Sequence, residues 1–597
     1  ARFRGEIRLD IGEGGGDAQQ LTLGPGEARE LRFDHPVAVA DIEAEWRVTI
    51  VDENGRTRYL GGTQKRDTTP GDDWVPPPPS PKEQRAGFIA FQRPYTTPVL
   101  YRAVPQREEV VSKLAVTACR GEFEPVTVAL YPLRDVDALS VAVSDLAGPG
   151  GATISATHVV TRVVQWQSKW DDPSSFEALE HLLPRFDTLP LVQHRTRRLW
   201  LTVQIPEDAV PGIYRGGGML HADGVDTHLP LVLTVLPFEL LRPEGMGYFM
   251  YFPGVKDPSI SNRDYLEMIA RDMRDHGMTT FTIEHWVQQK HPDTGAFFVD
   301  VDEQVSEKLG VTYSELLTIL DEAGLGVEAP LLDAYSMHYR PDQIVALDAI
   351  FRQRGWPEVL FYIEDEIDYP ERIAKARKTL EAIRKISPDI RTTTALGSVG
   401  AAALGHMYDV WIGCSTPEMV SRCLAKGKAP WTYSCRKVYE VDGAFQRAFY
   451  GRAAWKLGLR GVGLWSYAED KAVFDRLGRV QTYADAPVFM PEHTKMYGHV
   501  HLEPDEVVPS VTWEAVREGI DDYRYFWTLK KMAEAVSADA DPTRRRRAED
   551  AMRLLDEIAE RTPVIADDKK FGRNREALGD PDAERARVIG AIVGLQN

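Results

Sequence analysis

The residues with the clearest capacity for acid–base chemistry form one short run. Four carboxylates follow a single apolar stretch, 358–363, and they are Glu364, Asp365, Glu366 and Asp368. The stretch is rich in β-branched and aromatic residues, as is typical of a buried strand. In α/β folds, ligands bind and chemistry takes place at the carboxyl ends of strands. Two neighbouring carboxyl groups in one cleft cannot both ionise freely, so one is biased toward an acid role. The run therefore indicates a hydrolase, and a sugar as its substrate.

Two pairings of these carboxylates are compatible with the sequence. Side chains alternate along a strand, so Glu364, Glu366 and Asp368 would share one face. Beyond the strand end the alternation relaxes, and the adjacent side chains of Asp365 and Glu366 can then both point into one cleft at the carboxyl ends of the strands. The pairing Asp365/Glu366 therefore competes with Glu364/Glu366.

Two other interpretations of the acid run stay open. The run could begin a helix near Tyr369–Pro370, because acids in a first turn complement the helix dipole. It could also bind a divalent cation, which accepts clustered carboxylates. However, no second acidic cluster is obvious at another strand end, and the chain lacks a Cys-x-x-Cys pair or a His cluster with zinc spacing. We therefore expect no metal and no cofactor.

Aromatic and polar residues at the ends of other expected strands complete the candidate site. Sugars have apolar faces edged by hydroxyls, so their sites combine aromatic platforms with hydrogen-bonding groups. A single aromatic residue is more often part of a core, so the argument rests on the set. The expected substrate-binding residues are His285, Trp286, Tyr335, Trp431, Tyr433, Trp465 and Tyr467.

The elements that must position these residues read as alternating strands and helices from 239 to 503. The expected strands are 247–252, 279–283, 327–332, 359–363, 391–395, 409–413, 430–434 and 461–467. Eight such units predict a (β/α)₈ TIM-type barrel, with a short helix between the fifth and sixth strands. The acid run then falls at the end of the fourth strand, on the catalytic face.

The rest of the chain divides into further modules, because 597 residues are too many for one core. Alternating apolar and polar residues predict a small β module over 1–65 and, after a Pro-rich linker at 66–86, a β-sandwich domain over 87–238. The charged segment 504–597 reads as helical and is expected to pack on the barrel. The predicted fold class is therefore multidomain, with N-terminal β-sandwich modules, a central barrel and a C-terminal helical segment.

Composition excludes some classes of partner. The formal net charge of −19 argues against nucleic acid and against an anionic membrane surface. No apolar run is long enough to span a bilayer, and a carbohydrate is the expected partner. The chain starts at Ala1 rather than Met, which we interpret as the removal of a leading segment. The location stays open, with a bacterial-type secreted or periplasmic location favoured over a cytoplasmic one, and the oligomeric state stays open as well.

Four segments resemble glycoside hydrolase family 123 and its related uncharacterised barrel proteins. They are Cys119–Pro125, Ile205–Gly216, the strand-four motif Tyr362–Glu366, and Pro509–Tyr523, which is similar to the family's post-barrel helix. The resemblance covers most of the chain, and the last segment is the longest. In the family the strand-four motif is usually followed by Pro, whereas Ile367 and Asp368 follow it here.

The resemblance implies a retaining β-N-acetylgalactosaminidase that uses substrate-assisted catalysis. Glu366 would be the general acid/base, and Asp365 would hold the 2-acetamido group that attacks the anomeric carbon. Tyr433 or Tyr467 would position the acetamido oxygen. The alternatives are a glycosidase for another sugar that uses Glu364/Glu366, and a non-catalytic carbohydrate-binding protein.

Overall fold

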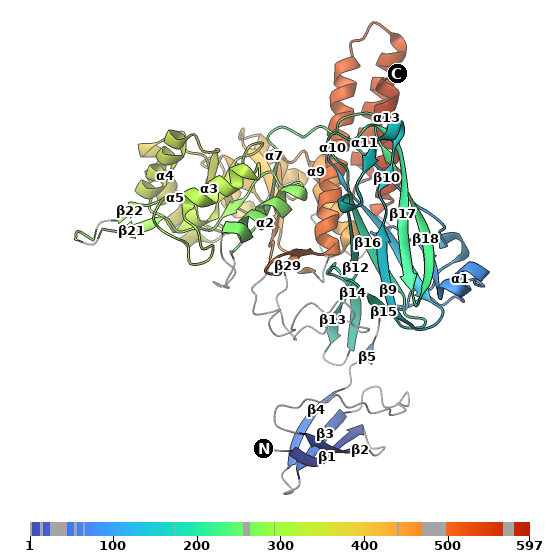
Figure 1. The fold of residues 1–597 in the computed structure, drawn as a ribbon. Coiled ribbons are helices and arrows are strands. Elements are labelled where there is room, and N and C mark those ends of the chain that lie inside the picture. The colour runs from blue at the N-terminus through green and yellow to red at the C-terminus, as the bar shows by residue number, and fades with distance from the viewer. Residues whose placement is uncertain are drawn as a thin grey trace.

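The computed structural model confirms the predicted multidomain architecture of β domains, a (β/α)₈ barrel and C-terminal helices (Figure 1). It describes residues 3–11, 16–23, 45–52, 57–63, 66–67, 69–172, 175–254, 263–291, 293–295, 297–438, 441–468, 497–564 and 578–596.

The first module is a four-stranded antiparallel sheet with strand order β2-β1-β3-β4. Its strands are β1 (Phe3–Ile11), β2 (Gly16–Leu23), β3 (Glu45–Asp52) and β4 (Thr57–Thr63). Figure 1 draws it below the other domains, to which β5 (Arg66–Asp67) leads. In the expected linker, β5 pairs with β14 (Ser175–Glu180), which forms a hairpin with β13 (Trp166–Asp172). The helix α1 (Pro81–Ala86) follows.

The second module is a sandwich of two sheets. One sheet has the order β12-β16-β8-β6, and the other contains β11-β10-β17-β18-β7 with β9 and β15 at its side. Its longest strands are β8 (Phe123–Pro132), β9 (Val136–Val143), β16 (Arg197–Gln204), β17 (Gly212–Ala222) and β18 (Val225–Val235). The shorter strands are β6 (Phe88–Phe91), β7 (Leu114–Ala118), β10 (Leu146–Ala147), β11 (Thr153–Ile154), β12 (Val159–Val163) and β15 (Leu189–Leu191). Alternate side chains of both sheets meet in one apolar core.

The barrel sheet runs in the order β19-β28-β27-β26-β25-β24-β23-β20, with every pair parallel. Its strands are β19 (Gly247–Tyr251), β20 (Thr282–Ile283), β23 (Leu331–Asp333), β24 (Val359–Tyr362), β25 (Thr392–Ala395), β26 (Val410–Ile412), β27 (Ala429–Ser434) and β28 (Gly461–Trp465). At the seam between β19 and β20, the N–H groups of Thr279 and Thr280 donate to Tyr248 O, and threonine hydroxyls add further hydrogen bonds. The Thr279 hydroxyl accepts from Tyr248 N–H at 2.9 Å, and the Thr282 hydroxyl accepts from Phe252 N–H at 2.8 Å.

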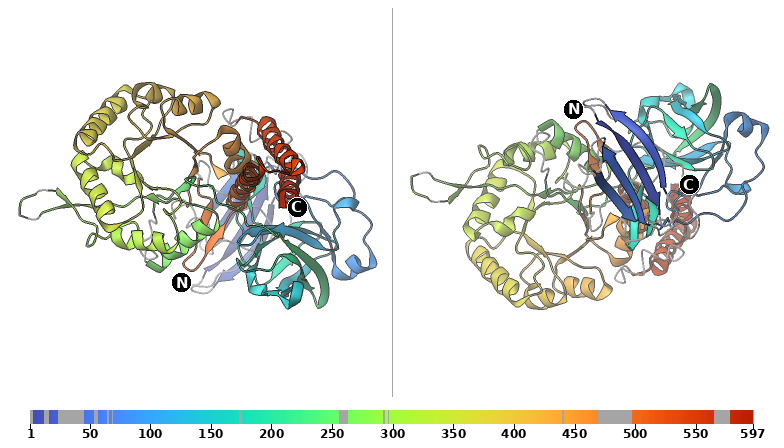
Figure 2. Two further views of the ribbon diagram at one scale, coloured as in Figure 1. Left: turned by 90° about the horizontal axis from the view of Figure 1, so that it is seen from above. Right: turned by 90° about the horizontal axis from the view of Figure 1, so that it is seen from below.

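Helices surround the strands, as the views along the barrel show (Figure 2). They are α2 (Arg263–Asp275), α3 (Tyr313–Glu322), α4 (Pro341–Arg354), α5 (Pro370–Ile386), α6 (Ser398–Leu404), α7 (Pro417–Leu424), α8 (Gly443–Ala448) and α9 (Ala454–Leu457). The helix between the fifth and sixth strands, α6, has only 7 residues, as predicted. Between β20 and α3, the hairpin β21 (Gln288–Lys290) and β22 (Phe297–Val299) projects away from the barrel.

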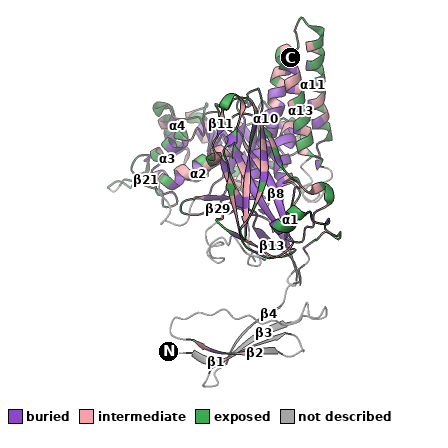
Figure 3. Cartoon of the chain, turned by 45° about the vertical axis from the view of Figure 1, so that its right-hand side comes forward, coloured by how far each residue is buried: buried purple, intermediate pink, exposed green. Residues whose placement is uncertain are grey.

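The helix α10 (Val511–Val536) completes the ring of helices after the last strand. It packs on α8 and, through Gly277 and Ile520, against the end of α2. Its first half, 511–523, is buried around its whole circumference, so it has no solvent-facing side there (Figure 3). Helices α11 (Pro542–Arg561) and α13 (Pro581–Gln596) also pack on α10.

The start of α10 also joins the barrel to the sandwich. Two main-chain hydrogen bonds of 2.8 Å connect Val511 N–H to His181 O and Leu183 N–H to Pro509 O. The Trp200 indole N–H donates to the Glu514 carboxylate at 3.2 Å. One helix therefore serves the barrel, the sandwich and the C-terminal helices.

Candidate active site

The acid run leaves its strand through two residues in the left-handed region of backbone space. β24 ends at Tyr362, and Glu364 and Glu366 have φ values of 62° and 44°. A left-handed backbone costs a non-glycine residue about 1–2 kcal/mol, and such strain concentrates at functional sites. The two left-handed residues end the alternation of side chains along the strand. As a result the charges of both Asp365 and Glu366 act on one hydroxyl, that of Tyr433.

Hydrogen bonds hold this strained backbone at four consecutive carbonyl groups. The donors to Ile363 O, Glu364 O, Asp365 O and Glu366 O are Tyr408 Oη at 2.7 Å, Thr394 Oγ1 at 2.5 Å, Arg372 Nη1 at 2.6 Å and Asp368 N at 2.8 Å. Three of the donors come from helix α5, strand β25 and the segment after α6. The neighbouring elements therefore fix the carboxylates in place.

Asp365 is oriented by the tyrosine three residues before it. The Tyr362 hydroxyl accepts a hydrogen bond from Ala395 N–H at 3.0 Å and donates to Asp365 Oδ1 at 2.6 Å. Because the main-chain N–H occupies the hydroxyl oxygen, its proton is directed to the carboxylate. The described residues place no donor on Asp365 Oδ2, which can therefore accept from a ligand.

The other three carboxylates of the run have different environments. Glu366 is exposed, and no hydrogen-bond donor from the described part of the chain lies on its carboxylate. Glu364 instead forms an ion pair with Lys375 at 2.5 Å. Asp368 accepts from Gly400 N–H at 2.8 Å in the first turn of α6. Helix α5 begins only after the run, at Pro370, so these acids are not in its first turn.

Three aromatic side chains line the mouth beside the carboxylates. They are Tyr251, Tyr433 and Trp465, which occupy inward-facing positions near the ends of β19, β27 and β28, above an apolar barrel interior. The Tyr251 ring lies 5.6 Å from that of Tyr433 and 5.4 Å from that of Trp465, measured between centroids. Burial, followed by the charges of Cys435, Asp365 and Glu366, raises the pKa of Tyr433. Its hydroxyl therefore stays protonated at neutral pH and can donate a hydrogen bond.

A second aromatic group forms part of the rim. The rings of Trp286 and Tyr335 meet edge to face with centroids 5.3 Å apart. The Trp286 indole N–H donates to Gln288 O at 2.6 Å, which fixes the ring. Tyr335 lies in the short helix η5 (Ala334–His338) directly after β23. Both rings are half-buried, as suits a surface that a sugar can cover.

The structure places His285 behind the strand instead of in the mouth. Its side chain is fully buried, and its ring nitrogens lie 2.8 Å from Trp286 O and 3.0 Å from Val311 O. Its ring packs on Tyr313 of helix α3. The alternation of β20 accounts for this placement, because the neighbouring inward position belongs to Glu284.

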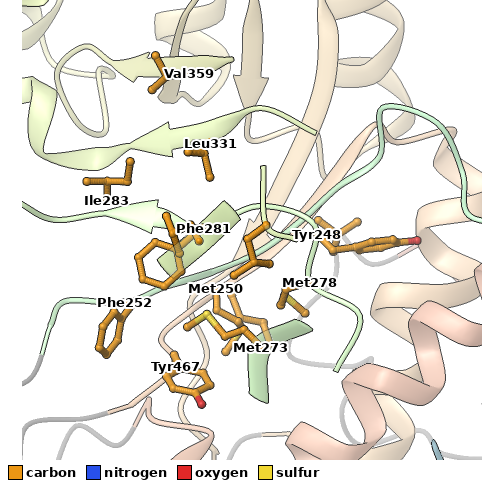
Figure 4. Packing of buried hydrophobic residues seen from close by; sticks show 14 of the residues in the cluster. Tyr248, Met250, Phe252, Met273, Met278, Phe281, Ile283, Leu331, Val359 and Tyr467 are labelled. Atoms are coloured by element: carbon orange, nitrogen blue, oxygen red, sulfur yellow. The ribbon is translucent and has the colours of Figure 1, made fainter. Parts of the chain in front are cut away.

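Tyr467 and Trp431 are also outside the mouth. The Tyr467 hydroxyl donates to Asp272 of α2 at 2.6 Å, and its ring packs beside Phe252 in the layer between strands and helices (Figure 4). Trp431 points into the barrel but two residues below Tyr433, where it fills the space above Gly247 and Gly461. It lines a hollow of about 710 Å³ at the opposite end of the barrel, away from the acid run.

The mouth contains one carboxyl group that the sequence analysis did not single out. Glu284 follows β20, in which Thr282 pairs with inward-facing Leu332 and Ile283 pairs with Asp333. Glu284 is thus the next inward position. Burial raises its pKa to about 7; the charge of Lys308 lowers it and that of Asp365 raises it. The alternation of the strand was the signal that could have identified it.

No group of His, Cys, Asp and Glu side chains within the described ranges is arranged to hold a metal ion. None of the helices in those ranges is long and apolar enough to cross a membrane.

The fold and the site define a (β/α)₈-barrel protein with an adjacent carboxylate pair at the end of its fourth strand. A solved structure with this architecture is a family 123 glycoside hydrolase from Clostridium perfringens, whose structural analysis concerns glycolipid glycan hydrolysis. The two share 13% sequence identity and a TM-score of 0.59, over 85% of this chain and 98% of that chain. The predicted resemblance to family 123 is confirmed at the level of the fold.

Two other similar structures match about half of the chain. An endo-β-1,4-mannanase from Thermotoga petrophila has a TM-score of 0.30 at 11% identity, over 47% of this chain and 77% of that chain. A family 5 glycoside hydrolase from Bacteroides vulgatus has a TM-score of 0.30 at 12% identity, over 49% and 68%. No family model and no curated protein matches the sequence.

Proposed function

We propose that the protein is an exo-acting retaining glycoside hydrolase that releases β-linked N-acetylgalactosamine. The observation that carries this proposal is the pair formed by oriented Asp365 and exposed Glu366 at the end of strand four. The shared fold with a family 123 glycoside hydrolase supports the reaction class. The aromatic walls of the mouth support a carbohydrate ligand.

In this mechanism the substrate supplies its own nucleophile. Glu366 donates its proton to the glycosidic oxygen while the 2-acetamido carbonyl oxygen attacks the anomeric carbon, which gives the free aglycone and an oxazoline that is still protonated on nitrogen. Glu366 then takes a proton from the water that opens the oxazoline, and the configuration is retained. No second carboxylate has to stand across the ring as nucleophile, so the pair can be adjacent in the chain.

Asp365 and Tyr433 position the acetamido group in this proposal. Asp365 Oδ1 is held by Tyr362, so Oδ2 accepts from the acetamide N–H and increases the nucleophilicity of its carbonyl. Tyr433 keeps its proton because its pKa is raised, and its hydroxyl donates to the acetamido oxygen.

The test is turnover of aryl β-N-acetylgalactosaminides whose N-acyl group carries zero to three fluorine atoms. We expect the parent compound to be hydrolysed with release of the β-anomer, seen by NMR. We expect the rate to fall steadily with fluorination, because fluorine weakens the carbonyl nucleophile. Activity on a panel of other aryl glycosides, with no dependence on the acyl group, would contradict the proposal. Sugar binding without turnover would point to the non-catalytic alternative.

Replacing Tyr362 by phenylalanine should impair catalysis more than stability. The variant removes the donor that orients Asp365, and we expect kcat/KM to fall roughly 10- to 100-fold, since a hydrogen bond to a charged group contributes about 1.5–3 kcal/mol. Steady-state kinetics with the parent aryl glycoside measures this. The control is Tyr214→Phe, which removes a hydroxyl that donates to Val210 O at 2.9 Å in the sandwich. Equal activity of the two variants would remove Tyr362 from the mechanism.

A further inference from the structure

Glu284 stands in the mouth as a third carboxyl group that the proposed mechanism does not use. Its side chain is half-buried, and the register of β20 directs it inward, above Thr282. The described residues place no hydrogen-bond donor on its carboxylate. The next residue, His285, points the other way and is fully buried.

Titratable groups of both neighbouring strands and of η5 lie within electrostatic range of Glu284. The charge of Glu284 raises the pKa of Tyr251 on β19, Asp333 on β23 and Tyr335 in η5, in each case after burial as the larger cause. The Asp365 carboxylate raises the pKa of Glu284 itself, and Lys308 is the cation that opposes this. Glu284 therefore lies in the same polar cluster as Asp365, with an aromatic side chain on either side.

We propose that Glu284 recognises the substrate by accepting hydrogen bonds from ring hydroxyls on the C3–C4 edge of the sugar. This inference rests on the proposed function, because it uses the assignment of Asp365 to the C2 substituent. Glu366 takes the glycosidic oxygen at C1. If Asp365 contacts the C2 substituent and Glu284 lies beside Asp365 on the side away from C1, the hydroxyls nearest to Glu284 are those on C3 and C4.

A carboxylate is suited to this role. Its two oxygens can accept from two adjacent hydroxyls, and a hydrogen bond to a charged acceptor is stronger than one to a neutral acceptor. The C4 hydroxyl also distinguishes the galacto from the gluco configuration. A site that hydrogen-bonds a substrate hydroxyl discriminates strongly against the analogue that lacks it.

The experiment compares wild type and Glu284→Gln on three aryl β-glycosides: the parent N-acetylgalactosaminide and its 3-deoxy and 4-deoxy analogues. We expect Glu284→Gln to lower kcat/KM on the parent roughly 10- to 100-fold. For wild type, we expect the deoxy substrate that lacks the bound hydroxyl to have a kcat/KM lower by a similar factor. For Glu284→Gln, we expect this substrate to be hydrolysed almost as well as the parent, because the substitution and the deoxygenation delete the same interaction. The matched control is Glu371→Gln, an exposed residue in the first turn of α5 that gives the same change in charge.

The pH profile separates this role from a structural one. Because kcat/KM reports ionisation in the free enzyme and burial raises the pKa of Glu284 to about 7, we expect wild-type kcat/KM to rise as the pH increases through about 7. Glu284→Gln should lose this limb, and Glu371→Gln should keep it. A folding defect would lower activity at every pH without removing the limb.

The outcomes distinguish this inference from the function on which it rests. If wild type hydrolyses the parent but the losses from Glu284→Gln and from both deoxy substrates are additive, the role of Glu284 is wrong and the function stands. If wild type hydrolyses no N-acetylgalactosaminide, the function fails, and equal calorimetric affinity of wild type and variant for free N-acetylgalactosamine then also overturns the role of Glu284. A larger loss that azide reverses, with α-glycosyl azide as product, would make Glu284 a nucleophile and overturn both.

Discussion

Replacing Glu366 by glutamine should reduce hydrolysis of a substrate with a poor leaving group by about 10²- to 10⁴-fold, the usual contribution of a positioned general acid. The expected loss is smaller for a dinitrophenyl glycoside, because its leaving group needs no proton. Azide should then restore turnover by opening the oxazoline without help from a base. The product should be the β-glycosyl azide, since attack on the oxazoline retains the configuration. Kinetics with the two leaving groups, with and without azide, measures the effect.

Two neighbouring variants identify which carboxylate works with Glu366. Asp365→Asn should lower kcat/KM on both leaving groups, because the acetamido group loses its orienting partner. Glu364→Gln should have a smaller effect, since Glu364 is paired with Lys375. Undiminished turnover in Glu366→Gln would refute the assignment. Loss of activity in Glu364→Gln together with full activity in Asp365→Asn would favour the other pairing and another sugar.

Replacing Arg585 by methionine should lower the free energy of unfolding by about 3–5 kcal/mol, the range for removing one partner of a buried ion pair. Arg585 extends from α13 to three carboxylates, with nitrogen–oxygen distances of 2.7 Å to Glu124 on β8, and 2.9 Å to Glu518 and 2.6 Å to Asp522 on α10. All four side chains are buried. Without the guanidinium, Glu124 and Glu518 lose this ion pair in the interface between the sandwich and the helices, while Asp522 keeps its ion pair with Arg447 at 2.7 Å. Urea or thermal unfolding measures the loss.

The loss should grow with pH. Burial raises the pKa of Glu518 to about 7, and Arg585 opposes that rise. In the variant its folded-state pKa is higher still, so protonation relieves the cost at low pH and ionisation adds to it as the pH rises. We therefore expect a larger destabilisation at about pH 8 than at about pH 6. The control is Arg587→Met on the same helix, whose ion pair with Glu557 is at the surface and should leave the melting temperature unchanged. Equal melting temperatures of the two variants would show that the buried cluster does not stabilise the assembly.

The alternation of apolar strand-like stretches with helical stretches was sufficient to predict the barrel and the position of the acid run. Eight short apolar stretches identify eight strands, and the carboxylates after the fourth lie at the carboxyl end of the parallel sheet. The site residues depended on finer detail. Neighbouring residues of a strand point to opposite sides, one into the barrel mouth and the next toward the outer helices. For this reason Glu284 faces inward and His285 is buried behind the strand. Tyr467 lies in the outer layer because it follows the strand end by two residues and bonds to α2.

Contacts between distant segments could not be predicted in this way. The depth of Trp431 depends on the absence of side chains at Gly247 and Gly461, which come from other strands. The orientation of Asp365 depends on Ala395 N–H, in the next strand. Glu364 and Glu366 have a left-handed backbone, which glutamate disfavours. Hydrogen-bond donors from three other segments hold the main chain in this conformation.

The position of α10 means that the barrel is not an exchangeable module. The last helix around the barrel is also the one that the sandwich binds through Val511 and Trp200 and that α13 binds through Arg585. A fragment ending at residue 503 would lack that helix and would leave one side of the strands uncovered. The sandwich, the barrel and the terminal helices should consequently lose protection from proteolysis together, and shuffling of domains at these boundaries should produce insoluble protein.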